Sequence, residues 1–326
     1  MSSAMCLRLR RWVSPFKKLQ LHHNNLLHPF SYYTTIENNK PNQQPLPPPI
    51  QVSLTESTGR GVFATRRIGV GDLIHTAKPL VSHPTYSSLH NVCYFCLKKL
   101  SNKAQTIQFC SNECREQAKD FYSVEERVDW SAYDEYCRKQ GLKYPLLVKR
   151  LACMVASGAA SAECLDILQP ARLSTEMILK MENEFSLLKS CLMNTDVKDE
   201  EMAFLTKQWY IGVLARIRIN SFRVELAGGL YEDLFLSAVA SVDAEASVGN
   251  AVYMLPSFYN HDCDPNIHIV WIENVNARLK ALRDIEQGEE LRICYIDASL
   301  DQNARQTILF EGFGFRCSCS RCVYGD

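Results

Sequence analysis

Short apolar segments separated by glycines occupy residues 50–83. Val52 and Leu54 mark the first segment, residues 58–64 the second and residues 71–74 the third. Alternation with a period of two places successive side chains on opposite faces of a strand, and glycines favour tight turns between strands. The pattern therefore predicts three short strands at the start of the folded part.

Between residues 115 and 222 the apolar period becomes helical. Apolar side chains recur there at helical offsets in two sets, Leu146, Leu147, Leu151, Met154 and Val155, then Met202, Leu205, Trp209, Val213 and Ile217. Gly158 and Pro170 interrupt the run, and the charged residues 198–201 indicate a solvated turn. We expect helices whose apolar stripes face a core.

Strand-like patterns return after residue 252. An apolar run, residues 252–258, leads into the polar residues 260–266, in which Pro265 fixes its own φ and restricts the residue before it. Three further strands are predicted at residues 267–272, 279–285 and 291–295. We expect residues 260–266 to form a rigid loop between two extended segments.

Composition narrows the class of protein. A chain of 326 residues can bury a sizeable core, as one large domain or two medium ones. Lysine plus arginine and aspartate plus glutamate number 36 each, so no global charge favours nucleic acid or an anionic surface. No apolar run reaches the length of about 18 residues that a membrane-spanning helix needs.

Residues 1–49 differ in composition from the rest of the chain. No acidic residue occurs up to Ile36, while arginines and lysines alternate with apolar residues. This composition predicts a mitochondrial transit peptide, with a disordered basic tail or a nuclear import signal as alternatives. The polar, proline-rich residues 38–49 are then a linker, and the folded part begins near Ile50.

Fourteen cysteines are present, and eight of them fall in groups with metal-ligand spacing. The first group joins the pairs Cys93, Cys96 and Cys110, Cys114, which can close a tetrahedral Zn²⁺ site of four thiolates, the make-up of a structural site. The other six are scattered and read as free thiols, which suits a reducing compartment better than a disulfide framework. They are Cys6, Cys137, Cys153, Cys164, Cys191 and Cys294.

Three motifs carry a resemblance to a known family. Residues 260–266, Asn-His-Asp-Cys-Asp-Pro-Asn, resemble the Asn-His-x-Cys-x-Pro-Asn signature of SET-domain protein lysine methyltransferases. Gly-Glu-Glu-Leu at residues 288–291, followed by Tyr295, resembles the second signature of that family. Residues 109–114 resemble the core of a MYND zinc finger that lacks its second and fourth ligand pairs, which implies a finger reduced to one zinc.

The resemblance, to small SET-and-MYND or trithorax-related proteins, covers roughly residues 50–324. It implies an α+β class, with a β-rich SET fold that contains a pseudo-knot. The implied parts are a SET domain at residues 50–300, interrupted by a finger-like insertion at 92–119 and a helical insertion at 120–222, with its C-terminal half at 246–300 and a post-SET zinc-binding tail at 301–326.

The resemblance also implies S-adenosyl-L-methionine as cofactor. The implied cofactor residues are Gly59, Arg60, Gly61, Asn220, Asn260, His261, Tyr295 and Phe315. Gly59 and Gly61 would let the backbone approach the cofactor and Arg60 would meet its carboxylate, although Gly-x-Gly by itself is also a hairpin signal. Asn220 taken alone reads as a polar residue at a helix end.

Tyr295 is the implied catalytic residue, beside the sulfonium methyl at the inner end of a lysine channel. A lysine amine, with a usual pKa of about 10.4, must arrive deprotonated, and a dry channel favours that form. Carbonyl oxygens and the Tyr295 hydroxyl would stabilise the positive charge on the methyl group. Phe313 falls where many relatives have a second tyrosine of the channel, so the degree of methylation stays open.

Cys317, Cys319 and Cys322 provide three ligands of an incomplete zinc site. In post-SET tails of the family the fourth ligand is the cysteine of the first signature, which implies that Cys263 completes a second structural Zn²⁺ site. Metal binding would then be coupled to formation of the active site.

The resemblance implies a monomeric protein-lysine N-methyltransferase and a chromatin regulator, with a histone as the first substrate class to consider. A chromatin location conflicts with a mitochondrial leader. We expect no direct nucleic-acid partner and no membrane. A catalytically silent SET scaffold that binds a peptide or protein partner is the alternative from another class. A nucleic-acid-binding zinc finger is a third reading, based on Lys98, Lys99, Lys103, Arg115 and Lys119.

Overall fold

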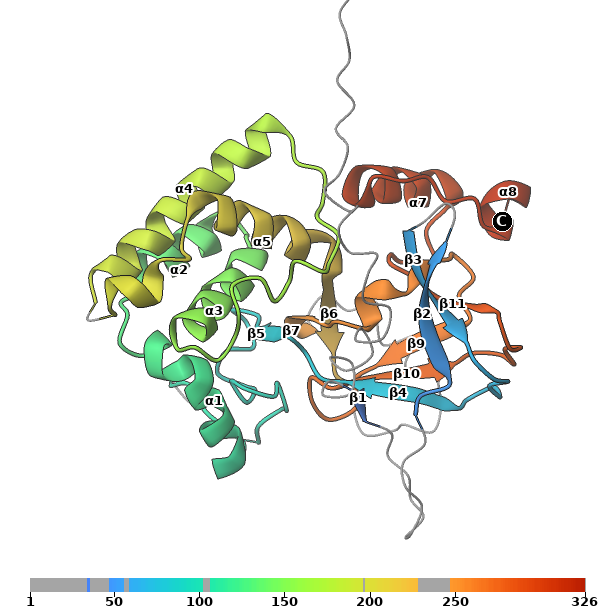
Figure 1. Ribbon diagram of the computed structural model, residues 1–326, viewed down its shortest axis with the longest axis horizontal. Helices are drawn as coiled ribbons and strands as arrows, with labels where there is room; N and C mark the ends of the chain where they lie inside the picture. Colours follow the sequence, from blue (N-terminus) through green and yellow to red (C-terminus); the bar gives the residue numbers. More distant parts are fainter. Residues whose placement is uncertain are drawn as a thin grey trace, which may run out of the picture.

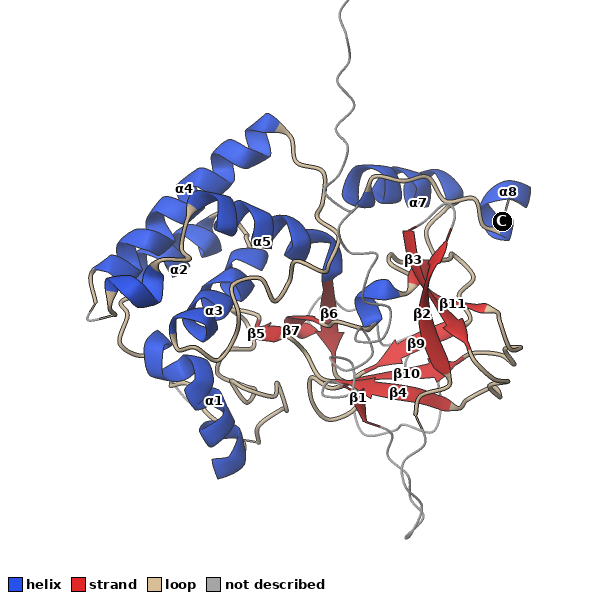
Figure 2. Cartoon of the chain, in the orientation of Figure 1, coloured by secondary structure: helices blue, strands red, loops and turns tan. Residues whose placement is uncertain are grey.

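The computed structural model describes residues 34–35, 47–55, 59–101, 106–195, 197–227 and 247–325. Figure 1 shows a helical lobe and a β-rich lobe, with a small sheet between them. Figure 2 shows that most strands gather in one lobe, and that the last helices of the chain lie over it rather than with the other helices. The predicted α+β class is confirmed.

Two four-stranded sheets make up the β-rich lobe. The first has the order β1 (Thr34–Thr35), β4 (Leu73–Ala77), β10 (Ala277–Ala281) and β9 (Ile267–Val270). The second has the order β2 (Ile50–Thr55), β3 (Gly59–Ala64), β11 (Glu290–Ile293) and β8 (Asn260–His261). Each sheet pairs early strands with late strands, so segments remote in sequence build this lobe together.

The small sheet between the lobes is antiparallel. Its order is β5 (Val81–Pro84), β7 (Ser247–Val252) and β6 (Ser221–Glu225). Every residue of β5 and β7 is buried. No residue with a side chain fits at Gly249 in β7, because a Cβ there would lie 2.6 Å from the carbonyl oxygen of His83.

Among the described residues, five helices form the helical lobe. They are α1 (Asn112–Glu125), α2 (Ser131–Lys139), α3 (Tyr144–Ala156), α4 (Thr175–Met193) and α5 (Lys207–Asn220), with a short 3₁₀ turn η3 (Asp199–Met202) before α5. Ser111, Ser174 and Thr206 begin α1, α4 and α5 with side-chain oxygens that accept a backbone N–H. Helix α3 is central, because it packs against α1, α5 and β5.

The C-terminal part adds short elements to the β-rich lobe. They are η6 (Pro256–Phe258), α7 (Gln302–Ile308), the π-helical turn η7 (Leu309–Phe313) and α8 (Ser320–Tyr324). Gly314 ends η7 at a φ of 81°, which favours glycine. Within the described ranges, no helix combines the length and the apolar character needed to cross a membrane.

The predicted helical run of residues 115–222 is present in outline, and the first predicted strands correspond to β2, β3 and β4. Three boundaries are wrong. The run at residues 252–258 is not extended, since β7 ends at Val252 and Pro256 starts η6. The last predicted strand ends at Ile293, and the strand predicted at residues 279–285 ends as β10 at Ala281.

A fourth boundary differs in the helical lobe, because α5 begins at Lys207 and leaves Met202 and Leu205 outside it. The predicted transit peptide and linker fall almost wholly outside the described residues, which begin with residues 34–35 and resume at residue 47.

Candidate active site

The two predicted signatures lie side by side because β8 and β11 pair in parallel. In this pair Asn260 lies opposite Arg292, and His261 lies opposite Ile293. The buried Asn266 side chain joins the same segments: its Nδ2 donates to the Glu290 carbonyl (2.9 Å), and its Oδ1 accepts from the Arg292 N–H (2.7 Å). The pairing supplies the contact between signatures that the predicted pseudo-knot requires.

His261 connects the first signature to two other parts of the site. Its Nδ1 accepts a hydrogen bond from the backbone N–H of Tyr295 (3.1 Å), and its Nε2 lies 3.3 Å from the Cys263 sulfur. Because Nδ1 is an acceptor, the ring proton belongs on Nε2, where it points at that sulfur. Burial lowers the pKa of His261 to about 4, so the ring is neutral.

Tyr295 lies just beyond β11, in an aromatic group. Its ring centroid is 5.1 Å from that of Phe313, 5.3 Å from that of His261 and 6.4 Å from that of Phe315. The Tyr295 hydroxyl donates to the carbonyl of Tyr259 (2.6 Å), and burial raises the pKa of Tyr295. The hydroxyl proton is thus held by a backbone acceptor, and the oxygen lone pairs face elsewhere.

Tyr259 also makes a contact with its side chain: its hydroxyl lies 3.0 Å from Nε2 of His75. Both side chains are fully buried. Burial lowers the pKa of His75 to about 3, so this histidine is neutral as well. The backbone carbonyl of Tyr259 links this pair to Tyr295, and the sequence patterns did not mark either residue as part of the site.

The two glycines of the Gly-x-Gly segment are required for different reasons. Gly59 has a φ of 81° and open space around it, which fits a turn. Gly61 has no such conformation, but a Cβ there would lie 2.7 Å from Oε1 of Glu290 and 3.2 Å from Nδ2 of Asn260. Gly61 therefore makes room for the contact between Asn260 and Glu290.

Arg60 and Asn220 both bind the connection between α3 and α4. The Arg60 guanidinium donates to the Ile167 carbonyl and lies 4.4 Å from the centre of the Phe258 ring. The Asn220 amide donates to the Gln169 carbonyl (2.9 Å) and back into α5. The carbonyls of Ile167 and Gln169 thus hold two predicted site residues, which the sequence did not reveal because backbone carbonyls leave no side-chain signal.

Among the described contacts, Asn220 meets neither Asn260 nor Tyr295. Apart from Gly59, the other predicted cofactor and channel residues form one connected group: Gly61, Arg60, Asn260, His261, Tyr295, Phe313 and Phe315. The residue that sequence reasoning quoted without a role is Glu290, which joins Asn260 to Arg292.

The tail cysteines meet Cys263. Its sulfur lies 3.9 Å from that of Cys317 and 3.6 Å from that of Cys322, and all four sulfurs, including that of Cys319, lie within 4.8 Å of one another. Tetrahedral Zn²⁺ with Zn–S bonds of about 2.3 Å places sulfurs about 3.8 Å apart. The gathering of these remote cysteines is as predicted, and the group fits a Zn²⁺ ion.

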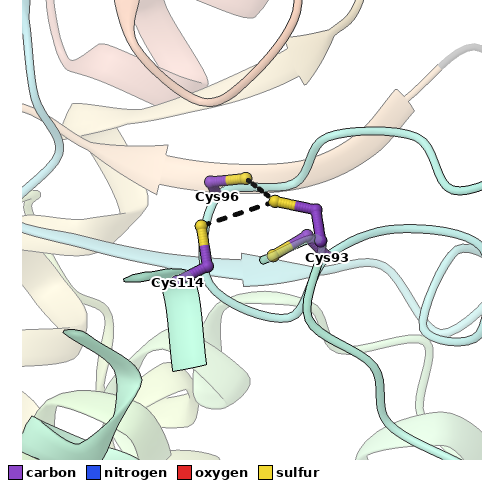
Figure 3. Close-up of side chains that lie close together, drawn as sticks. Cys93, Cys96 and Cys114 are labelled. Atoms are coloured by element: carbon purple, nitrogen blue, oxygen red, sulfur yellow. Dashed lines mark hydrogen bonds between the residues drawn. The ribbon is translucent and has the colours of Figure 1, made fainter. Parts of the chain in front are cut away.

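The finger-like insertion gathers the other four cysteines. Figure 3 shows the sulfurs of Cys93, Cys96 and Cys114 turned toward one another. Cys110 lies 3.5 Å from both Cys96 and Cys114, far longer than the disulfide length of about 2.05 Å. All cysteines in the described ranges are free thiols.

Ionisation in this group also fits a cation. A hydrogen bond from Cys96 lowers the pKa of Cys93 to about 4, and the same bond raises the pKa of Cys96. A divalent cation stabilises all the thiolates together, so these residues also fit Zn²⁺.

Residues 59–296 match the SET domain family. The chain therefore belongs to the SET-domain family, and the predicted SET fold is confirmed. It is 56% identical over 326 residues to an Arabidopsis thaliana protein named histone-lysine N-methyltransferase ATXR4, over 98% of this chain and 99% of that protein.

More distant relatives share less. A Dictyostelium discoideum protein named SET and MYND domain-containing protein DDB_G0292454 is 23% identical over 272 residues, 77% of each chain. A crystal structure of the SET domain of LSMT bound to lysine and AdoHcy aligns at 15% identity and a TM-score of 0.38, over 83% of this chain. This chain spans about half, 53%, of that solved chain.

Proposed function

We propose that this protein is an S-adenosyl-L-methionine-dependent protein-lysine N-methyltransferase. The observation that carries the proposal is the joining of both signatures at one place, where His261 accepts the backbone N–H of Tyr295. Membership of the SET-domain family supports it, as does the 56% identical relative that is named a histone-lysine N-methyltransferase.

We assign the cofactor to the residues around Asn260. Asn260 and His261 hold it, Gly59 and Gly61 let the backbone approach it, and Arg60 faces its carboxylate. Phe315, whose ring centroid is 5.9 Å from that of His261, packs on the adenine. Asn220 belongs to this set only through residues 166–172, which it shares with Arg60.

When bound, S-adenosyl-L-methionine supplies a methyl group on a positively charged sulfur. Transfer of that group to a lysine side chain would need a neutral amine and would leave the bonding electron pair on sulfur. Tyr295 contributes its hydroxyl oxygen, which can face the methyl and the amine because its proton is held by Tyr259. The buried, aromatic surroundings favour the neutral amine that the reaction needs.

Phe313 is proposed to line the lysine channel beside Tyr295. A phenyl ring leaves more room than a tyrosine and offers no hydroxyl to hold a partly methylated amine. We expect Phe313→Tyr to shift the products toward fewer methyl groups, as measured by mass spectrometry of a methylated peptide. An unchanged product distribution would remove Phe313 from the channel.

A histone is the first substrate class that we propose, with chromatin as the location, because of the name of the 56% identical relative. The name of that relative does not support the mitochondrial prediction, which rests on residues 1–49. The monomeric state, the absence of a nucleic-acid partner and the domain boundaries remain predictions. The two cysteine groups are proposed as structural zinc sites.

The test is calorimetric binding of S-adenosyl-L-methionine to the zinc-loaded full chain, beside Asn260→Ala and Tyr295→Phe. We expect micromolar binding that Asn260→Ala weakens and Tyr295→Phe keeps, while Tyr295→Phe loses methylation of histones. Folded protein that binds no cofactor at millimolar concentration would leave the silent scaffold as the better explanation.

A further inference from the structure

The Glu290 carboxylate contacts two residues, one with each oxygen. Its Oε1 accepts a hydrogen bond from Nδ2 of Asn260 (2.7 Å). Its Oε2 accepts from Nε (2.9 Å) and Nη2 (2.6 Å) of Arg292. The Glu290 side chain is only 13% exposed, whereas that of Arg292 is 41% exposed, so the carboxylate is the shielded partner of these charged hydrogen bonds.

The contact decides which way the Asn260 amide faces. A carboxylate can only accept hydrogen bonds, so it selects the NH₂ end of the amide. The backbone carbonyl of Arg60 accepts from the same NH₂ group (3.1 Å). With two acceptors on its nitrogen end, the amide oxygen is turned away from Glu290 and Arg60.

The anchoring of Glu290 by Arg292 makes this orientation stable. Arg292 also pairs with Asp262 (3.3 Å), the residue after His261. The guanidinium therefore links both signatures, and it holds the carboxylate against rotation. Gly61 completes the arrangement, because any Cβ at that position would occupy the space of the Glu290 oxygen.

We propose that Glu290 is a positioning residue that sets the Asn260 amide for cofactor binding, a role that rests on the proposed function. An amide oxygen accepts hydrogen bonds, so the fixed orientation suits the α-ammonium group of S-adenosyl-L-methionine, which donates them. Without Glu290 the amide can rotate and present its NH₂ end, which repels the ammonium.

The first test needs no cofactor. In full-length protein labelled with ¹⁵N-asparagine, the Asn260 NH₂ signals are identified by their loss in Asn260→Ala. We expect hydrogen exchange of these protons to become at least about 10-fold faster in Glu290→Ala, because a charge-assisted bond is removed. Glu290→Gln keeps the volume and an acceptor oxygen, so its exchange rate should lie between those of the wild-type protein and Glu290→Ala. Exchange unchanged in Glu290→Ala would overturn the contact.

The second test measures cofactor affinity in a double-mutant cycle. Glu290→Ala should weaken binding of S-adenosyl-L-methionine by about 10- to 100-fold, with Glu290→Gln restoring part of the loss. Combined with Asn260→Ala it should cost little more, because both changes remove one function. Losses that add independently would show that Glu290 acts only on the fold, and would overturn its positioning role.

Glu289→Ala is the matched control. Glu289 is the neighbouring carboxylate, but it pairs with Arg283 and Asn266 rather than with Asn260. Glu289→Ala should leave the hydrogen exchange of the Asn260 NH₂ protons unchanged. Equal effects of both variants would count against a specific role for Glu290.

Gly61→Ala provides a route that keeps the carboxylate. The added Cβ would displace Oε1, so this variant should reproduce the faster exchange of Asn260. Wild-type protein that binds no cofactor would defeat the proposed function and the cofactor role of Glu290 together. The exchange measurement would then still decide the contact itself, so the two failures can be told apart.

Discussion

Each of the two cysteine groups offers four thiol ligands, but the groups differ in where these cysteines lie in the sequence. Cys93, Cys96, Cys110 and Cys114 belong to one short insertion. Cys263 follows β8 and its three partners follow α7, so the second group joins two segments that are remote in sequence.

The second group also touches the candidate active site through Nε2 of His261, which lies 3.3 Å from the Cys263 sulfur. The first group has no such contact among the described residues and borders α1, which begins within it. A metal held by neighbours in sequence stabilises one segment. A metal held by remote segments can form its site only with the fold around it, so its binding energy is tied to the active site.

Breaking the tail group should have the largest effect. Cys322→Ser removes one ligand, so we expect one Zn²⁺ per chain instead of two and a loss of methyl transfer of about 100-fold or more. Metal analysis measures the zinc content, and the rate of methylation of a histone substrate measures the loss of methyl transfer. Cys191→Ser, which removes a free thiol in α4, is the control. Full activity without the tail metal would disprove the coupling.

Breaking the finger group should have a smaller effect on chemistry. Cys110→Ser also removes one Zn²⁺, but the opening stays local, so the rate should fall by about threefold or less. Hydrogen exchange should rise at residues 93–101 and 106–114 and not in β8 or β11. A rate as low as that of Cys322→Ser would mean that the insertion supports the site directly.

The effect that is smallest at neutral pH concerns the stability of the β-rich lobe, because it appears only as the pH falls below about 6.5. Burial lowers the pKa of His75 from 6.5 to about 3, so the unfolded chain takes up this proton first as pH falls. The stability from neutral His75 is complete above 6.5 and is lost between about 6.5 and 3, with a slope of up to about 1.4 kcal/mol per pH unit.

The free energy of unfolding should depend less on pH in His75→Gln than in the wild-type protein, as measured by denaturant unfolding at pH 7 and pH 5. Contributions from the cysteine groups are common to the two proteins and cancel in the comparison. A slope that is unchanged would mean that the ring is charged or hydrated. His83, near the finger group, has its pKa lowered by burial as well, so His83→Gln compares the two regions in the same measurement.

Much of the site could be predicted from sequence because its chemistry lies in compact motifs. Asn260, His261 and Cys263 are separated by three positions at most, and their side chains act locally. The partner of Cys263 in the tail needed the family resemblance, because spacing alone leaves three thiols incomplete. The predicted strand at Tyr295 was too long because a parallel pair of two residues has no visible period.

Other parts of the site had no pattern to find. The partners of Arg60 and Asn220 are the carbonyls of Ile167 and Gln169, which any residue type would offer. His75 and Tyr259 are distant in sequence and look like ordinary strand and loop residues. Glu290 lay inside a quoted motif, but only the distance to Asn260 gives it a role.

The small sheet between the lobes has a consequence for how the chain folds. In β5 and β7, Val81 pairs with Val252, although the whole helical lobe lies between them in sequence. Closing an unfolded loop of that length costs about 4–5 kcal/mol in chain entropy.

A helical lobe formed first would avoid most of that cost, because α3 packs on β5 and α5 runs directly into β6, the other neighbour of β7. Helices with local contacts form quickly, and they leave the ribosome before β7 does. We therefore expect the helical lobe to form first and to provide the surface on which β7 and the strands after it assemble.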